Sequence, residues 1–514
     1  MKPLAARQAT KSVVYPTIRV PSLPGKLLMG VFDDVGEYVD GTVLDRRSGE
    51  KGAPIPKDLL PPPTEAAHPE AIYAGPLYYH FGHFLLESLA RAWYAQRYPD
   101  IPLAWAGAHT WQDAHLRSWQ TEILDVLGIR NPTMIVADPT RFELLHIPDI
   151  GYRYDDWFHP EHAEFLGRFE GPPQIPGRRL WLSRSKIAND ARDFNAPATE
   201  RHLAAAGWHI AHPETLSVRE QLEELSRAEV VAGEEGSALH SLVLLKDVSS
   251  KSFRILRRHG HEHRNMHTVG NARAVNQTFH TLKRERVLRA EGRVVSKLTP
   301  NASETLDLLE VPVPCAQVSQ PEAPELSVLG RALENLAPKR LLEVGAAGSE
   351  LLVAATAATR VGVSSRFDFD PRPYAGSGAV FFELDLAQYA EHFHRKGERF
   401  DVIRIAETEF KEVMEAFRAS ERLAHQGTTW LLGTGEVAAR AALAVRLVHP
   451  GFTAKRLFVQ RTTVFVVRRV PGQPRREKGV GRLSAEDVAK RTRWLPITVA
   501  RPRRRRIHEA EDRG

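Results

Sequence analysis

Short apolar runs alternate with stretches of helical period along much of this chain. Residues 179–182, 208–211 and 229–232 have the apolar, β-branched or aromatic character of buried strands. Between them, residues 199–206 and 217–228 carry apolar positions at helical spacing, and the second stretch opens on a Ser-x-x-Glu capping box. Strands that alternate with helices favour a parallel sheet with helices on its faces.

The same alternation returns in the last third of the chain. Predicted strands there cover residues 340–344, 360–363, 401–405, 428–432 and 462–467. The chain is therefore expected to be an α/β protein. It would hold a pair of Rossmann-like domains followed by a third Rossmann-like domain.

Clusters of proline, which interrupts helices and strands, mark the expected boundaries. They divide the chain into two halves of a first region, a linker, a last folded domain and a tail. The corresponding ranges are 1–171, 172–297, 298–327, 328–470 and 471–514.

The composition narrows the function classes. The chain has 514 residues, of which 42% are hydrophobic and 26% charged, as in folded globular proteins. Its net charge of +7 is concentrated in the tail: residues 468–514 contain 15 Lys and Arg against 6 Asp and Glu, which leaves the remainder at −2. A nearly neutral body disfavours nucleic acid as a partner.

The cysteine content and the distribution of apolar residues bear on the location of the protein. The single cysteine, Cys315, excludes an internal disulfide framework and a multi-cysteine zinc site. No apolar run approaches the roughly 18 residues that cross a bilayer, and the first residues lack the apolar core of a secretion signal. A cytoplasmic location is expected.

The first chemical constellation lies in residues 78–93. A regular helix there would place His83, Glu87 and Arg91 on one polar face, opposite an apolar face. Gly82 would let another backbone approach, and His83 at the helix start would be a neutral, base-competent imidazole. The alternative is a surface helix with an ordinary Glu87–Arg91 ion pair.

Two further constellations follow predicted strands. Arg184 and Lys186, with Arg192 and Asn195 beyond them, suit an anionic ligand at the carboxyl edge of a parallel sheet; the alternative is a solvated basic loop. The Gly-Glu-Glu-Gly-Ser turn at 233–237 would direct backbone N–H groups at a phosphate. Its two glutamates would face sugar hydroxyls, since carboxylates repel phosphate.

Taken together, these blocks resemble glycosyltransferase family 61, whose bacterial members include capsular polysaccharide biosynthesis proteins. The resemblance covers roughly residues 70–280. It implies a GT-B-like pair of facing Rossmann-like domains, a nucleotide-sugar donor bound mainly by the second, and inversion at the anomeric carbon. The motif positions are His83, Arg184, Arg192, Asn195, Gln221, Gly233, Gly236 and Ser237. Two positions depart from the family pattern, Ala196 and Glu235.

The last folded domain resembles class I methyltransferases. The likeness rests on Glu-x-Gly-x-x-Gly at Glu343, Gly345 and Gly348, which implies a pocket for S-adenosylmethionine. The second strand, however, ends in Ser364 and Ser365, where an acidic residue would hold the ribose hydroxyls. We expect a degenerate domain that binds S-adenosylmethionine weakly or not at all; the alternative is an active, sugar-modifying methyltransferase.

The sequence thus predicts an inverting glycosyltransferase of polysaccharide or glycolipid assembly. His83 is the expected base, with Glu87 or Glu235 as competitors, while Arg184, Lys186 and the 233–237 turn would hold the diphosphate. No metal or other cofactor is expected for transfer. The expected partners are a nucleotide sugar and a polysaccharide or lipid-linked glycan acceptor.

Two other functions and a further partner stay open at this point. A bifunctional enzyme would glycosylate and then methylate one glycan, and a non-catalytic scaffold would only bind glycan or nucleotide sugar. The basic tail predicts peripheral attachment to the anionic inner membrane; the alternative is a solubilising tail.

Overall fold

The computed structural model divides into two compact units. The first comprises Met1–Lys283 and Glu304–Val311, and the second comprises Arg284–Ser303 and Pro312–Gly514. The structure describes residues 2–18, 27–43, 46, 52–64, 66–107, 115–187, 196–257, 264–282, 285–288, 294–298, 302–312, 324–345, 350–367, 369–374, 377–448, 451–459 and 462–469. The expected basic tail, 471–514, lies outside them.

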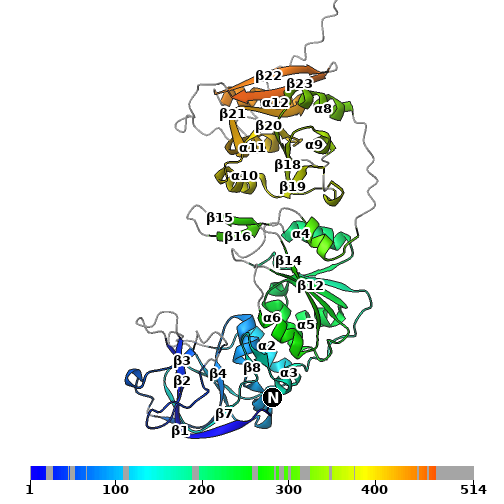
Figure 1. The fold of residues 1–514 in the computed structure, drawn as a ribbon. Helices are drawn as coiled ribbons and strands as arrows, with labels where there is room; N and C mark the ends of the chain where they lie inside the picture. The colour runs from blue at the N-terminus through cyan, green and yellow to red at the C-terminus, as the bar shows by residue number, and fades with distance from the viewer. Residues whose placement is uncertain are drawn as a thin grey trace, which may run out of the picture. The chain divides into compact units, whose positions relative to one another are not determined.

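The N-terminal half of the first unit is built on a mixed seven-stranded sheet (Figure 1). The order is β3-β2-β1-β7-β4-β5-β6, with β4 parallel to β5 and β7. β1 instead runs antiparallel to β2 and β7. For the β1–β2 pair the reason is local, because the short connection cannot hold the crossover that a parallel pair needs. This half is therefore α/β as expected, but its sheet is not parallel throughout. The strands are β1 Ala6–Ile18, β2 Leu27–Phe32, β3 Gly52–Pro54, β4 Ala67–Pro76, β5 Leu103–Ala106, β6 Thr133–Val136 and β7 Thr140–Pro148.

Short helical segments and one small hairpin accompany this sheet. The helices are η1 Lys57–Leu59, α1 Phe81–His83, η2 Phe84–Ser88, η3 Ala92–Arg97, α2 Ser118–Val126 and α3 Pro160–Leu166. The hairpin joins β8 Tyr152–Arg153 to β9 Trp157–Phe158.

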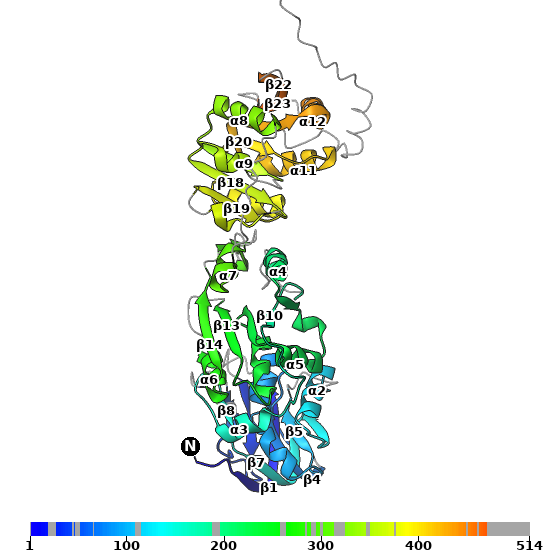
Figure 2. The same cartoon turned by 90° about the vertical axis from the view of Figure 1, so that its right-hand side faces the viewer.

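The second half of the first unit is the expected parallel sheet (Figure 2). Its order is β11-β10-β12-β13-β14, so the chain winds in both directions from β10 and the topology switches between β10 and β12. The predicted capping box is present at Ser217, whose hydroxyl accepts from the Glu220 N–H. The elements are β10 Arg179–Leu182, α4 Ala196–Ala205, β11 His209–Ala211, η4 Pro213–Thr215, α5 Val218–Arg227, β12 Val230–Glu234, η5 Ser237–Leu244, β13 Ser252–Arg257, α6 Arg264–Ala272 and β14 Asn276–Thr281.

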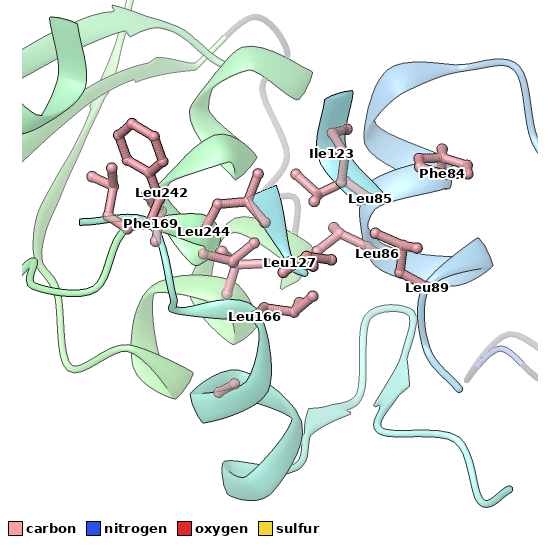
Figure 3. Close-up of a cluster of buried hydrophobic side chains, with 14 of the residues drawn as sticks. Phe84, Leu85, Leu86, Leu89, Ile123, Leu127, Leu166, Phe169, Leu242 and Leu244 are labelled. Carbon is pink, nitrogen blue, oxygen red and sulfur yellow. The ribbon is translucent and has the colours of Figure 1, made fainter. Parts of the chain in front are cut away.

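One hydrophobic core joins these two halves. Figure 3 shows apolar side chains of η2 and α2 lying beside those of η5 and of the segment around Leu166 and Phe169. Burial of this area removes the apolar faces of both halves from water. The labelled members are Phe84, Leu85, Leu86, Leu89, Ile123, Leu127, Leu166, Phe169, Leu242 and Leu244.

The second unit holds another seven-stranded sheet, ordered β19-β18-β17-β20-β21-β23-β22. The first five strands are parallel, and β23 runs antiparallel to both of its neighbours. All five strands predicted in this region are present. Its elements are β15 Glu285–Leu288, β16 Val294–Leu298, α8 Pro324–Leu336, β17 Arg340–Val344, α9 Glu350–Ala354, β18 Thr359–Ser364, η6 Arg372–Tyr374, β19 Ala379–Glu383, α10 Leu386–Arg395, β20 Phe400–Ile405, α11 Phe410–Ser420, η7 Glu421–Leu423, β21 Ala424–Thr434, α12 Gly435–Val448, β22 Phe452–Val459 and β23 Thr462–Arg469.

The expected linker is partly folded. Within it, α7 Ser303–Leu308 forms a helix. Arg254 of β13 donates to the Leu309 carbonyl at 3.0 Å and pairs with Glu310. These contacts attach residues 304–311 to the first unit. Among the described helices of the whole chain, none is long and apolar enough to cross a membrane.

Candidate functional site

The segment that carries His83 is not the regular helix that its periodicity predicts. After the single turn of α1, the chain widens into the π-helical turn η2, where the Leu89 N–H donates to the Phe84 carbonyl at 3.1 Å. η3 then continues as a 3-10 helix. Because the winding changes twice, a constant 100° per residue does not describe the side-chain directions.

The expected solvent-facing polar stripe is consequently wrong. Glu87 and Arg91 are both buried, at 5% and 4% exposure. The Arg91 guanidinium donates to the carbonyls of Pro148 and Gly41, so it does not form the surface pair with Glu87. With only one helical turn, α1 also provides no substantial dipole for His83.

Glu87 instead forms a three-residue cluster with the partly exposed His83 and the buried Arg46. Its Oε2 lies 2.6 Å from His83 Nδ1. Its two oxygens accept from Arg46 Nε at 2.7 Å and Arg46 Nη2 at 2.6 Å, which is the bidentate geometry of a strong arginine–carboxylate pair. Burial disfavours the charged guanidinium, but the Glu87 carboxylate outweighs it, and the pKa of Arg46 is raised.

Aromatic rings surround the His83 imidazole. Ring centroids lie 4.9 Å away for His80, 5.4 Å for Tyr78 and 6.1 Å for Tyr154. The Arg46 guanidinium stacks 4.7 Å above Tyr154. Burial raises the pKa of the Tyr78 and Tyr154 phenols, while burial and then the neighbouring His83 and Arg184 lower the pKa of His80. Both phenols therefore stay neutral near pH 7.

Two further groups come from the switch point of the parallel sheet, between β10 and β12. Arg184 follows β10, and the turn that ends β12 brings Gly236 against it. A Cβ atom on Gly236 would lie 2.5 Å from Arg184 Nη1, so only glycine leaves the guanidinium this position. Gly82 also allows a close approach, because its Cβ would lie 3.0 Å from the Ser237 Cβ.

These groups line one open cleft of ≈ 270 Å³ within the first unit. It brings together His83, Arg184, Glu235, Gly236 and Ser237, all expected from the sequence. The remaining lining residues are His80, Gly82, Tyr154, His240, Asn265 and Met266.

A second set of hydrogen bonds involves two residues that line this cleft, Asn265 and His240. The buried Tyr152 hydroxyl donates to Asn265 Oδ1, and Asn265 Nδ2 lies 3.3 Å from His240 Nε2. Burial raises the Tyr152 pKa well above its ordinary value, so its phenol remains a donor. These hydrogen bonds orient the side chains of Asn265 and His240.

Other expected donor-binding residues lie elsewhere. The Gln221 amide donates to the Pro213 and Leu216 carbonyls at 2.9 and 3.2 Å, within its local turn. Lys186 is exposed after β10, and Gly233 lies inside β12. None of the three lines the cleft as the described residues form it. Arg192 and Asn195 lie outside the described residues.

Four functional candidates had no usable sequence signal: Arg46, Tyr154, His240 and Asn265. Arg46 has mostly polar neighbours in the sequence, and a single isolated bridge pairs it with Tyr154. Its partner Glu87 is 41 residues away. Separations of this kind leave no local periodicity to detect.

The methyltransferase-like motif lies in the second unit. Glu343 is fully buried and paired with Arg404 of β20. Gly345 has φ +78°, and a Cβ there would lie 2.3 Å from Glu407 Oε1. Burial, and then the neighbouring Glu412, raise the pKa of Glu407. Gly348 lies outside the described residues.

No group of three or more His, Cys, Asp or Glu in the described ranges is arranged to hold a metal ion.

Comparison with known proteins finds a family match within the first unit. No curated protein matches the chain. One similar solved structure is an O-methyltransferase from Bacillus cereus in complex with SAH, at 14% identity and a TM-score of 0.23, covering 32% of this chain and 87% of that one. Another is cofactor-bound Rv0187 from MTB, at 18% identity and a TM-score of 0.22, covering 31% and 84%. Residues 81–251 match the family model Glycosyltransferase 61, and this chain is a glycosyltransferase.

Proposed function

We propose that this chain is an inverting glycosyltransferase with a GT-B-like pair of domains. It would move a sugar from a nucleotide-sugar donor to a growing polysaccharide or glycolipid acceptor of the capsular type. The observation that carries the proposal is the cleft itself, which His83, Arg184 and the Gly236–Ser237 turn line together. A candidate base and a cationic side chain thus share one cleft, in which a sugar would bind.

The donor diphosphate would bind at the switch point between β10 and β12. Ligands of open parallel sheets bind at the carboxyl ends of strands where the topology reverses. Arg184 would make charge-assisted bonds to the phosphate oxygens, and the turn would add backbone donors. Lys186, Arg192 and Asn195 would extend this site along the nucleotide sugar, and Gln221 and Gly233 would shape it.

The reaction would be a single displacement at the anomeric carbon. His83 Nε2 would take the proton of the acceptor hydroxyl as that oxygen attacks, and Arg184 would stabilise the departing diphosphate. Glu235, which lines the same cleft, is the competing base. Glu87 is bonded to Arg46 and buried beneath His83, which makes it unsuited to contact the acceptor.

Neither a metal ion nor S-adenosylmethionine has a role in this proposal, because Arg184 and the turn supply the charge that the leaving group requires. The enzyme would work in the cytoplasm, with the basic tail at the inner membrane.

The test compares two variants with the wild type in transfer and donor-binding assays. His83→Ala should reduce turnover at least 100-fold while donor affinity persists, since one general base contributes about 10²–10⁴-fold. Arg184→Ala should chiefly weaken donor binding. Lys246→Ala, which removes an exposed cation paired with Glu170 away from the cleft, is the matched control and should change neither. Full turnover of folded His83→Ala would remove His83 as the base.

A further inference from the structure

We infer that Arg46 and Glu87 form a positioning pair that sets both the tautomer and the charge of the His83 imidazole. The inference rests on the proposed function of His83 as base. It adds two residues that touch neither donor nor acceptor but act through the ring.

The geometry selects one tautomer. His83 Nδ1 lies 2.6 Å from the Glu87 carboxylate and 3.4 Å from Arg46 Nη2. A carboxylate only accepts hydrogen bonds, so the short contact requires Nδ1 to carry the proton. Nε2 then keeps its lone pair, and His83 is about one-third exposed to the cleft, at 32%. This is the form that accepts a proton from a hydroxyl.

Arg46 performs two separate tasks on Glu87. The Arg46 guanidinium donates to both carboxylate oxygens, which keeps the Glu87 carboxylate from rotating away from the His83 imidazole. Its positive charge also offsets the negative charge beside Nδ1. An uncompensated buried carboxylate would favour imidazolium, which cannot act as a base.

The remaining groups around His83 do not duplicate this pair. Tyr78, His80 and Tyr154 present aromatic rings to the imidazole. Arg184, Glu235 and His240 also line the cleft. Glu87 makes the short contact with Nδ1, and its side chain is only 3% exposed, where solvent screens it weakly.

The pair predicts opposite pH effects for its two members. Glu87→Gln removes the negative charge, so the acidic limb of the kcat profile should move to lower pH, and kcat at its plateau should fall by about 10²-fold or more through loss of tautomer control. Arg46→Gln leaves the carboxylate uncompensated, so the acidic limb should move to higher pH. Arg46→Lys retains the charge and should restore the limb toward its wild-type position. KM for the donor should stay within about twofold in all three.

A matched control separates this role from structural support. Arg91→Lys alters another buried guanidinium near the same segment, one that bonds only to backbone carbonyls in the described structure. It should lower stability without moving the pH profile. In a His83→Ala background, Glu87→Gln should cause no further loss of turnover, because residues that act as one unit are not additive.

The outcomes distinguish this inference from the proposed function. If the acidic limb of the kcat profile lies at the same pH in folded Glu87→Gln, folded Arg46→Lys and wild type, the positioning pair is overturned. The proposal that His83 is the base would not be affected by that result. An active His83→Ala enzyme would overturn both. If Arg46→Gln does not fold, the other two variants decide the question. An acidic limb that moves in Glu87→Gln and stays near its wild-type pH in Arg46→Lys supports the pair.

Discussion

The fully buried imidazole of His162 should make the first unit sensitive to mild acid. His162 lies on α3, stacked between Phe158 and Phe165 at centroid distances of 5.4 and 5.9 Å. Within the described residues, neither ring nitrogen has a hydrogen-bond partner. Burial, and to a lesser degree the nearby His159, lower the pKa of His162 to about 3.

The sign of the effect follows from the proton balance. Between pH 6.5 and about 3, the unfolded chain is protonated at this position and the native chain is not. The unfolded state then binds more protons, so the free energy of unfolding falls as the pH falls. Linkage places the loss between pH 7 and pH 5 at about 2 kcal/mol for this group alone.

His162→Phe removes the ionisable group but keeps a flat ring between the two phenylalanines. Urea unfolding of wild type and variant, followed by tryptophan fluorescence at pH 7 and pH 5, measures the contribution. The wild type should lose about 2 kcal/mol more than the variant on acidification. His162→Leu should show the same reduced pH dependence, even where its stability differs. Equal pH dependence in all three proteins would refute the buried, uncharged imidazole.

Three further predictions concern the donor site, the second unit and the tail. Gly236→Ala adds a methyl group within 2.5 Å of Arg184 Nη1, so KM for the donor should rise about tenfold with little change in kcat; an unchanged KM would mean that Arg184 does not need this position. Calorimetric titration of the intact protein with S-adenosylmethionine should show no micromolar binding, because the Glu407 carboxylate lies against Gly345; micromolar binding with methyl transfer would make the enzyme bifunctional. Deletion of residues 471–514 should weaken sedimentation with anionic vesicles, since each basic residue near such a surface contributes about 1 kcal/mol; equal binding of both proteins would contradict membrane attachment.

Local pattern predicted three of the five strands in the second half of the first unit and five of the seven strands in the larger sheet of the second unit. Runs such as 179–182 and 340–344 appear as strands β10 and β17 with the same bounds. The Ser217 capping box opens α5, and the 233–237 turn lies at the sheet edge where glycine turns bind anions. These features depend on residues within a few positions of one another, so the sequence carries their cause directly.

The sequence also predicted His83, Arg184 and Gly236 as site residues, but it could not place them in one cleft. That placement depends on the core shared by η2, α2 and η5, whose members are far apart along the chain (Figure 3). The order of the parallel strands matters equally, because it brings β10 beside β12 and thereby Arg184 beside Gly236.

The environment of Glu87 was decided by tertiary structure alone. Helical periodicity predicted a solvent-facing carboxylate beside Arg91, on the assumption of constant winding. The π turn at Phe84–Ser88 breaks that assumption, and the cluster with Arg46 buries the carboxylate. A buried carboxylate requires a cationic partner, and the chain supplies it from 41 residues away. Local periodicity depends on residues a few positions apart and carries no information about a partner at that distance. Only the folded chain shows that Glu87 contacts His83 and Arg46, and not Arg91.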